Sequence, residues 1–344
     1  MRRTGAGRGD VVMGSDPAIP RIRIRRRGAG TLAVIALLLT ACSVGGARPD
    51  PRSTASTPTA PPTDPAPIAN LFDVGDGRRI YLECRGNGPA TVILIGGLRA
   101  AADYWNRTDT RPTTVMQGVG EKARVCSYDR PGTVREGNAF SRSDPIPQPS
   151  SERSAVADLH TLLAVADVRG PFVLVGHSYG GSIARLYAST YPDQVNGMVL
   201  VDALSEAVAD AMSPEQYAQL QTSQQVPAED IAAYPGIERL DADAVNAQLR
   251  SAPPIRPMPL TVLSADRLIA PQWQAMIDSG QLPPGTPSDL GAAVDRAQKV
   301  SQDFQAHLVP GAVHITETHS GHDIPLDYPS IVITAILDVV AEAR

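Results

Sequence analysis

A serine stands among glycines in the stretch FVLVGHSYGGSIARLYA, residues 172–188. The apolar run before Ser178 predicts a buried strand, and the amphipathic run after it predicts a helix. A serine hydroxyl becomes a nucleophile when a base takes its proton, and the oxyanion that it creates needs backbone N–H donors. A sharp strand-to-helix turn provides exposure and a donor together, if the residues two before and two after the serine are small. Gly176 and Gly180 meet that requirement, so we expect Ser178 to be a nucleophile.

The six histidines are the candidates for the base. His177 adjoins the serine, but neighbouring side chains on a turn diverge. His319 and His322 flank a Ser-Gly pair after the last predicted strand, and a base that follows the nucleophile in the chain suits the serine hydrolases built on parallel sheets. His314 and Glu317 lie nearby, but these spacings are not those of helical zinc ligands, and we expect no metal site.

Strands alternate with helices through most of the chain. The patterns predict strands at 71–86 (two, joined by a tight turn), 91–97, 123–132, 171–176, 195–203, 259–266 and 312–320, and helices at 154–168, 182–192 and 331–343. Such alternation predicts an α/β protein with a mostly parallel sheet and helices on both faces. Residues 204–256 lack strand character, and we expect them to form a helical lid.

These motifs together resemble the α/β-hydrolase-fold serine hydrolases, and among them the exported, esterase-type hydrolases. The matching pieces, in the family's order between residues 72 and 342, are VILIGGL, YDRPGT, VLVGHSYGGSIARLYA, MVLVDA and SGHDIPLDYP. The resemblance implies an eight-stranded sheet and cleavage of a small-molecule ester, or less readily an amide, through an acyl-enzyme without a cofactor. Two alternatives stay open: a haloperoxidase-like or acyltransferase activity at the same residues, and an inactive protein that serves binding.

The resemblance also implies residue roles. The family's base sits in a Gly-His pair on the loop after the last strand, which indicates His322, with His319 as the second choice. The oxyanion donors correspond to the backbone N–H groups of Tyr179, directly after the nucleophile, and of Leu98, after a glycine pair where many relatives have His-Gly. Because a backbone N–H does not depend on the side chain, the missing histidine leaves the donor in place.

The acid of the triad has two candidates. Most relatives place it after the strand that follows the lid, in a Gly-x-x-Asp pattern, but here TVLSADRLIAP puts Arg267 at that position and Asp266 one residue early. The superfamily's second location is the end of the strand after the nucleophile's helix, where MVLVDA carries Asp202. A carboxylate that ends an apolar strand needs a partner to offset its burial, and the catalytic imidazole would be one. We favour Asp202 and retain Asp266 as the alternative.

The N-terminal region reads as an export signal. The basic run RIRIRRR precedes the short apolar stretch GAGTLAVIALLLTACS, which has the order of a secretory signal peptide. Its end, LTAC, resembles the lipobox of bacterial lipoproteins, which implies removal of residues 1–41, lipid attachment to Cys42 and anchoring in the bilayer at the outer face of the cell membrane. The alternative is a plain signal peptide, which would leave the protein secreted. Residues 42–68 are rich in Pro, Ser and Thr and read as a linker. The folded domain is then 69–344.

Composition and the remaining cysteines agree with an exported globular domain. The net charge of −5 gives no basic surface of the kind that nucleic-acid binders carry, so we expect no nucleic-acid partner. Disulfides persist in oxidising compartments. In the family's fold the strands that carry Cys84 and Cys126 are neighbours, which makes a disulfide between them feasible.

Overall fold

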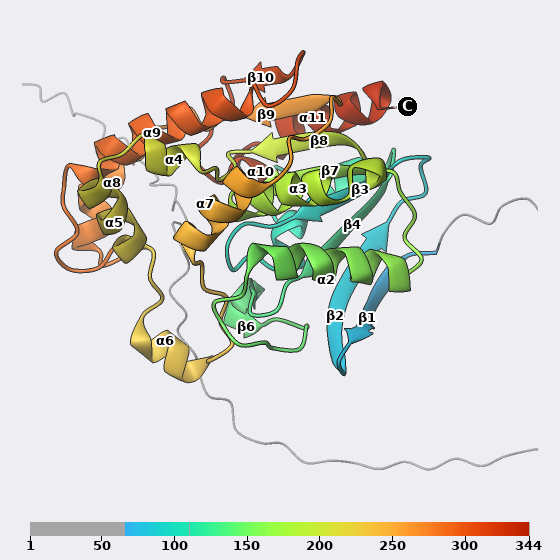
Figure 1. Ribbon diagram of the computed structural model, residues 1–344, viewed down its shortest axis with the longest axis horizontal. Helices are drawn as coiled ribbons and strands as arrows, with labels where there is room; N and C mark the ends of the chain where they lie inside the picture. The colour runs from blue at the N-terminus through green and yellow to red at the C-terminus, as the bar shows by residue number, and fades with distance from the viewer. Residues whose placement is uncertain (1–65, 110, 344) are drawn as a thin grey trace, which may run out of the picture.

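The computed structural model describes residues 66–109 and 111–343, and an eight-stranded sheet forms its centre (Figure 1). Its strands are β1 (Ile68–Gly75), β2 (Arg78–Arg85), β3 (Thr91–Ile95), β4 (Arg124–Asp129), β7 (Phe172–His177), β8 (Val195–Val201), β9 (Leu260–Leu263) and β10 (Val313–Ile315). The expected signal, Cys42 and most of the linker lie outside the described residues.

The order of the strands is that of an α/β-hydrolase sheet. It runs β1-β2-β4-β3-β7-β8-β9-β10; β2 is antiparallel to both of its neighbours, β1 and β4, and every other neighbouring pair is parallel. The predicted fold class and the leading hairpin are therefore confirmed. In a parallel sheet the carboxyl ends of the strands meet at one edge, and the loops after β3, β7, β8, β9 and β10 gather there.

Helices enclose the sheet from both sides (Figure 1). One face carries α2 (Glu152–Val165), α3 (Tyr179–Thr190) and α7 (Ala242–Ser251), and the other carries α1 (Val115–Gly120) and α11 (Pro329–Glu342). Alternate residues of β3 face opposite cores: Ile93 lies in the core with α2 and α3, and Val92 in the core with α1 and α11. Burial on both faces explains why these strands read as continuous apolar runs rather than as alternating patterns.

Two insertions form a helical cap. Residues 204–256, expected as a lid, carry α4 (Ala207–Asp210), α5 (Pro214–Ser223), α6 (Ala228–Ala233) and α7. A second insertion between β9 and β10 adds α8 (Ala270–Asp278) and α9 (Leu290–Gln305), which the sequence patterns did not predict. Trp273, Met276 and Leu290 of this insertion bury against Val208 and Met212 in a small core of their own.

Smaller elements complete the described chain: a two-stranded ribbon of β5 (Val134–Arg135) and β6 (Ala139–Phe140), the short helix α10 (Ile324–Asp327), and 3₁₀ turns at Ala102–Asn106, Glu136–Asn138 and Pro192–Gln194. Across the described ranges, no helix is both long and apolar enough to cross a membrane.

A disulfide joins the antiparallel edge of the sheet to its parallel centre. Cys84 of β2 and Cys126 of β4 are directly opposite partners in the ladder, and their sulfur atoms are bonded. Both residues are buried, at 2% and 0% exposure. The pairing that the resemblance made feasible is present in the structure.

Candidate active site

Ser178 occupies a strained turn between β7 and α3. Its φ of 51° and ψ of −125° are unusual for a residue with a side chain. The surrounding backbone holds this conformation, because the Ser178 N–H donates to the Val201 carbonyl (3.1 Å) and its own carbonyl accepts from the N–H groups of Gly181 and Leu204 (2.9 Å each). These hydrogen bonds to the sheet and the helix together offset the backbone strain. The half-buried side chain of Ser178 is thereby held at the end of β7.

The flanking glycines are required by contact. A Cβ on Gly176 would lie 2.5 Å from the Gly180 carbonyl oxygen, and a Cβ on Gly180 would lie 2.2 Å from the Ile95 carbonyl oxygen. Neither backbone atom can move without breaking the turn. The structure thus gives a steric reason for the small residues on which the sequence argument relied.

Asp202 and His322 meet beside this turn. The Oδ2 atom of Asp202 lies 2.6 Å from Nδ1 of His322, and Oδ1 accepts a hydrogen bond from the Ala265 N–H (3.2 Å). The carboxylate is 3% exposed, whereas the imidazole is half exposed. Burial alone would raise the pKa of Asp202, but the hydrogen bond and charge of His322 outweigh it and hold that pKa below its usual value. Asp202 is therefore a buried carboxylate that can stabilise the positive charge of a protonated His322.

Asp266, the alternative acid, contacts the same loop but not the ring of His322. Its two carboxylate oxygens accept the backbone N–H groups of His319 (3.0 Å) and Ser320 (2.9 Å). The Ser320 carbonyl in turn accepts from the Asp266 N–H (3.1 Å). Asp266 therefore clamps the backbone of the loop on which His322 lies.

His177, which the sequence analysis did not favour as the base, is hydrogen bonded to the backbone of His322. Its Nε2 lies 3.0 Å from the His322 carbonyl oxygen, so this nitrogen carries the proton and donates. Tyr104 stacks on the His177 ring and donates its hydroxyl proton to Asp323 (3.0 Å). Desolvation lowers the pKa of the buried His177 to about 4, which keeps it neutral. The residue before the nucleophile thus fixes the backbone of His322.

The helix α9 supports the loop of Asp202 with a polar face. The side-chain amides of Gln302 and Gln305 both donate to the Ala203 carbonyl (3.1 and 2.8 Å), one residue after Asp202. Ser301 is hydrogen bonded to Ser205 (2.8 Å). All three α9 side chains are buried, so the acid's loop is anchored to the second insertion as well as to the sheet. No sequence motif indicated this arrangement.

The chain segments that carry the two expected oxyanion donors, Leu98 and Tyr179, run next to Ser178. The chain of Gly97 passes close to the serine, because a Cβ on Gly97 would lie 3.1 Å from Ser178 Cβ. Leu98 follows Gly97, and Tyr179 is the first residue of α3. Among the described residues, neither backbone N–H has a hydrogen-bond acceptor. Both are therefore available to a bound group.

Comparison with known proteins identifies the family. A family model described as "Alpha/beta hydrolase family" matches residues 92–335, which is most of the chain. The chain belongs to that family. The match begins with β3 and ends within α11, and it contains the nucleophile turn, both candidate acids and His322.

Individual relatives match this chain over shorter stretches. The protein C23C11.06c of Schizosaccharomyces pombe is 34% identical over 155 residues, or 39% of this chain and 28% of that protein. YqjL of Bacillus subtilis is 27% identical over 143 residues, or 41% of this chain and 51% of YqjL. The matched stretch is thus about half or less of the length of these curated relatives.

One solved structure shares this fold at low identity, and another is similar at a lower TM-score. Cfl2 from Burkholderia cenocepacia has a TM-score of 0.50 and 19% identity, covering 78% of this chain and 94% of that one. A probable hydrolytic enzyme from Pseudomonas aeruginosa has a TM-score of 0.48 and 20% identity, covering 80% and 94%.

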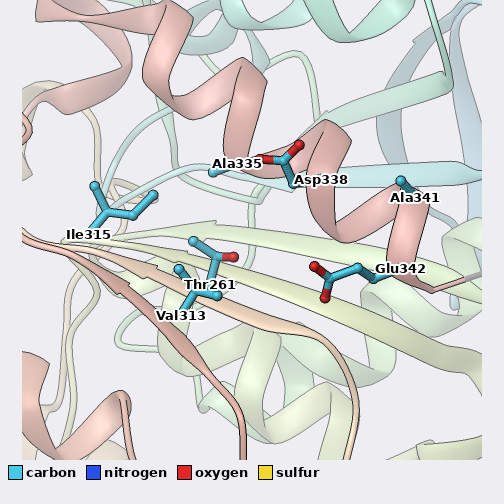
Figure 2. A pocket seen from close by; sticks show the side chains of 7 residues that line it. All are labelled: Thr261, Val313, Ile315, Ala335, Asp338, Ala341 and Glu342. Atoms are coloured by element: carbon cyan, nitrogen blue, oxygen red, sulfur yellow. The ribbon is translucent and has the colours of Figure 1, made fainter.

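A hollow elsewhere in the described part of the chain lies apart from the candidate site residues. Figure 2 shows it between the edge of the sheet and α11, lined by Thr261, Val313, Ile315, Ala335, Asp338, Ala341 and Glu342. None of the candidate site residues lines this hollow. Thr261 lies near the start of β9, whereas the candidate site lies at the carboxyl ends of the strands. Within residues 66–109 and 111–343, no three His, Cys, Asp or Glu side chains gather closely enough to hold a metal ion.

Proposed function

We propose that this chain is a serine hydrolase that cleaves a carboxylic ester, and less readily an amide, by a Ser-His-Asp acyl-enzyme mechanism. The observation that carries the proposal is the 2.6 Å contact between Asp202 and His322 beside the strained turn of Ser178. A carboxylate, an imidazole and a serine presented together at the carboxyl edge of the sheet are the parts that acyl transfer requires.

In this proposal each group has a step. The N–H at Nδ1 of His322 donates a hydrogen bond to Asp202, which leaves Nε2 as the basic nitrogen. Nε2 takes the proton of Ser178 as Oγ attacks the ester carbonyl, and the N–H groups of Leu98 and Tyr179 stabilise the tetrahedral oxyanion. The imidazolium then protonates the departing alcohol, leaving an acyl-serine. Water, deprotonated by His322, repeats the sequence and releases the acid.

Asp202 remains ionised throughout this cycle. Its lowered pKa keeps the negative charge in place while His322 becomes positive, so the carboxylate stabilises the imidazolium without taking its proton.

We further propose that the enzyme is an exported lipoprotein, anchored through Cys42 in the outer face of the cell membrane. The support is the basic-apolar-LTAC order of residues 21–42. Expression of the full chain with Cys42→Ala tests this proposal: the variant should move from the membrane fraction to the soluble exported fraction. Unchanged fractionation would refute lipid anchoring.

The catalytic proposal is tested by a fluorophosphonate probe, which reacts with activated serines, and by short-chain p-nitrophenyl esters. Folded wild-type protein should be labelled and should hydrolyse these esters, whereas Ser178→Ala should do neither. Absence of both reactions in the folded wild type would exclude the esterase mechanism and favour a binding role.

A further inference from the structure

A buried ion pair links the cap to the loop that carries Leu98. Arg130 follows β4, and Glu238 lies in the cap between α6 and α7. The guanidinium donates from Nε to Oε1 (2.6 Å) and from Nη2 to Oε2 (3.0 Å). The two side chains are only 3% and 5% exposed. A pair buried this deeply gains little net stability, because removing both charges from water offsets much of their attraction.

The same two side chains hold the backbone around Leu98. Arg130 also donates to the carbonyls of Gly96 (2.8 Å) and Gly97 (2.6 Å). Glu238 accepts the backbone N–H of Arg99 (2.5 Å). The peptide groups before and after Leu98 are therefore both fixed by one ion pair.

The planarity of the peptide then sets the direction of the Leu98 N–H. In a trans peptide the carbonyl oxygen of one residue and the N–H of the next point in opposite directions. The Gly97 carbonyl is held on Arg130, so the Leu98 N–H is turned away from Arg130. Hydrogen bonding of that carbonyl to a cation also polarises the peptide and makes its N–H a stronger donor.

We propose that Arg130 and Glu238 are a positioning pair that presets the Leu98 N–H as an oxyanion donor, and that the cap completes this arrangement by supplying Glu238. The inference rests on the proposed esterase function. The pair touches no substrate, and it acts on the reaction through the orientation of one peptide group.

The experiment compares three full-length variants with the wild type. Glu238→Gln removes the charge but keeps the shape, and Arg130→Lys keeps the charge but loses the planar fork that holds two carbonyls. Asp158→Asn is the control, because it disrupts a bidentate Arg78–Asp158 pair (2.7 and 3.1 Å), and the hydrogen bonds of this carboxylate go to Arg78 rather than to Arg130, Glu238 or the loop of Leu98. Each variant is checked for folding by circular dichroism before kcat and KM are measured with p-nitrophenyl butyrate.

A misdirected oxyanion donor weakens the transition state rather than substrate binding. We expect kcat to fall roughly 10- to 100-fold in Glu238→Gln and Arg130→Lys, with KM within about twofold, since complete loss of one donor costs about 10²- to 10³-fold. Phosphonylation by the fluorophosphonate should slow in parallel. Asp158→Asn should keep the wild-type kcat. Wild-type kcat in both test variants, or an equal loss in the control, would overturn the proposal.

Amide hydrogen exchange gives a readout that needs no turnover. The peptide covering residues 93–101 should exchange faster in Glu238→Gln and Arg130→Lys, and at the wild-type rate in Asp158→Asn. If the wild type lacks esterase activity and labelling, the proposed function fails, while exchange still reports whether the pair holds the loop. Unchanged exchange in folded test variants contradicts the inference directly. If Glu238→Gln does not fold, Arg130→Lys decides.

Discussion

The carboxylate of Asp202 and the imidazole of His322 lie 2.6 Å apart although 120 residues separate them in the chain. Asp202 ends β8 and His322 follows β10, and one strand, β9, lies between these two in the sheet. The contact is possible because both loops turn inward at the carboxyl edge. The nearer acid by strand order, Asp266 after β9, is occupied with the backbone of the histidine loop.

Replacement of each acid should separate these roles. Asp202→Asn removes the charge that stabilises the imidazolium, and kcat should fall by about 10⁴ with the fold intact. Asp266→Asn weakens two hydrogen bonds to backbone N–H groups and should lower the free energy of unfolding by about 1–3 kcal/mol, with most of the activity retained. Steady-state kinetics and urea unfolding of the two variants provide the comparison; a larger kcat loss in Asp266→Asn would reverse the assignment.

His177 should make stability depend on pH in the acid range. Its pKa is lowered to about 4 in the folded protein and is about 6.5 in the unfolded chain, so between these values the unfolded state binds more protons. Stability must then rise with pH through this window. The free energy of unfolding of the wild type should be compared with that of His177→Gln at each pH. The value for the wild type minus that for the variant should fall by roughly 3 kcal/mol from pH 7 to pH 4. A constant difference would show that His177 titrates normally.

Glu152 should act in the opposite direction. This first residue of α2 is fully buried, and the nearby Ser182 hydroxyl and Arg185 charge offset only part of the cost of burying its carboxylate. Desolvation raises its pKa to about 7, so the folded state binds more protons than the unfolded state between about 4.5 and 7. Stability from this group falls as pH rises and is lowest above pH 7. Relative to the wild type, Glu152→Gln should gain roughly 3 kcal/mol between pH 4.5 and pH 8, measured by urea unfolding.

The two groups oppose each other over the same pH range. The wild-type curve alone can therefore be flat, and only the variant differences reveal either titration. If neither difference changes with pH, both groups are solvated in solution.

The polar face of α9 should matter to activity although it touches no substrate. Gln302→Leu with Gln305→Leu removes both donors to the Ala203 carbonyl next to Asp202. We expect a fall of about tenfold in kcat, equivalent to about 1.4 kcal/mol in the barrier, because the acid's loop loses its anchor. Gln248→Leu on α7 is a control, since its amide bonds only within its own helix and to Arg153 on the surface. Equal kinetics in the double variant and the control would exclude this role.

Sequence patterns predicted what depends on neighbours along the chain. The strand, the glycine turn and the helix around Ser178 are one continuous segment, so their pattern is visible along the chain. The acid depends on how distant loops meet, so the sequence left Asp202 and Asp266 open. The helix α9 escaped prediction because, after Leu290 at its start, its buried residues are small or polar and give only a weak apolar pattern: Gly291, Ala293, Ala297, Ser301, Gln302 and Gln305. The same polar face is what binds the loop of the acid.

The place of Glu238 in the cap has a consequence for engineering. A cap inserted between two strands of a sheet can be exchanged for another when a different substrate range is wanted. Here, replacing residues 204–256 with the cap of another protein would remove Glu238. The buried Arg130 guanidinium would then lack a counter-charge, which would lower the free energy of unfolding by about 3–5 kcal/mol. A chimera of this protein must therefore carry an acid at the position of Glu238, or replace Arg130 in the same design.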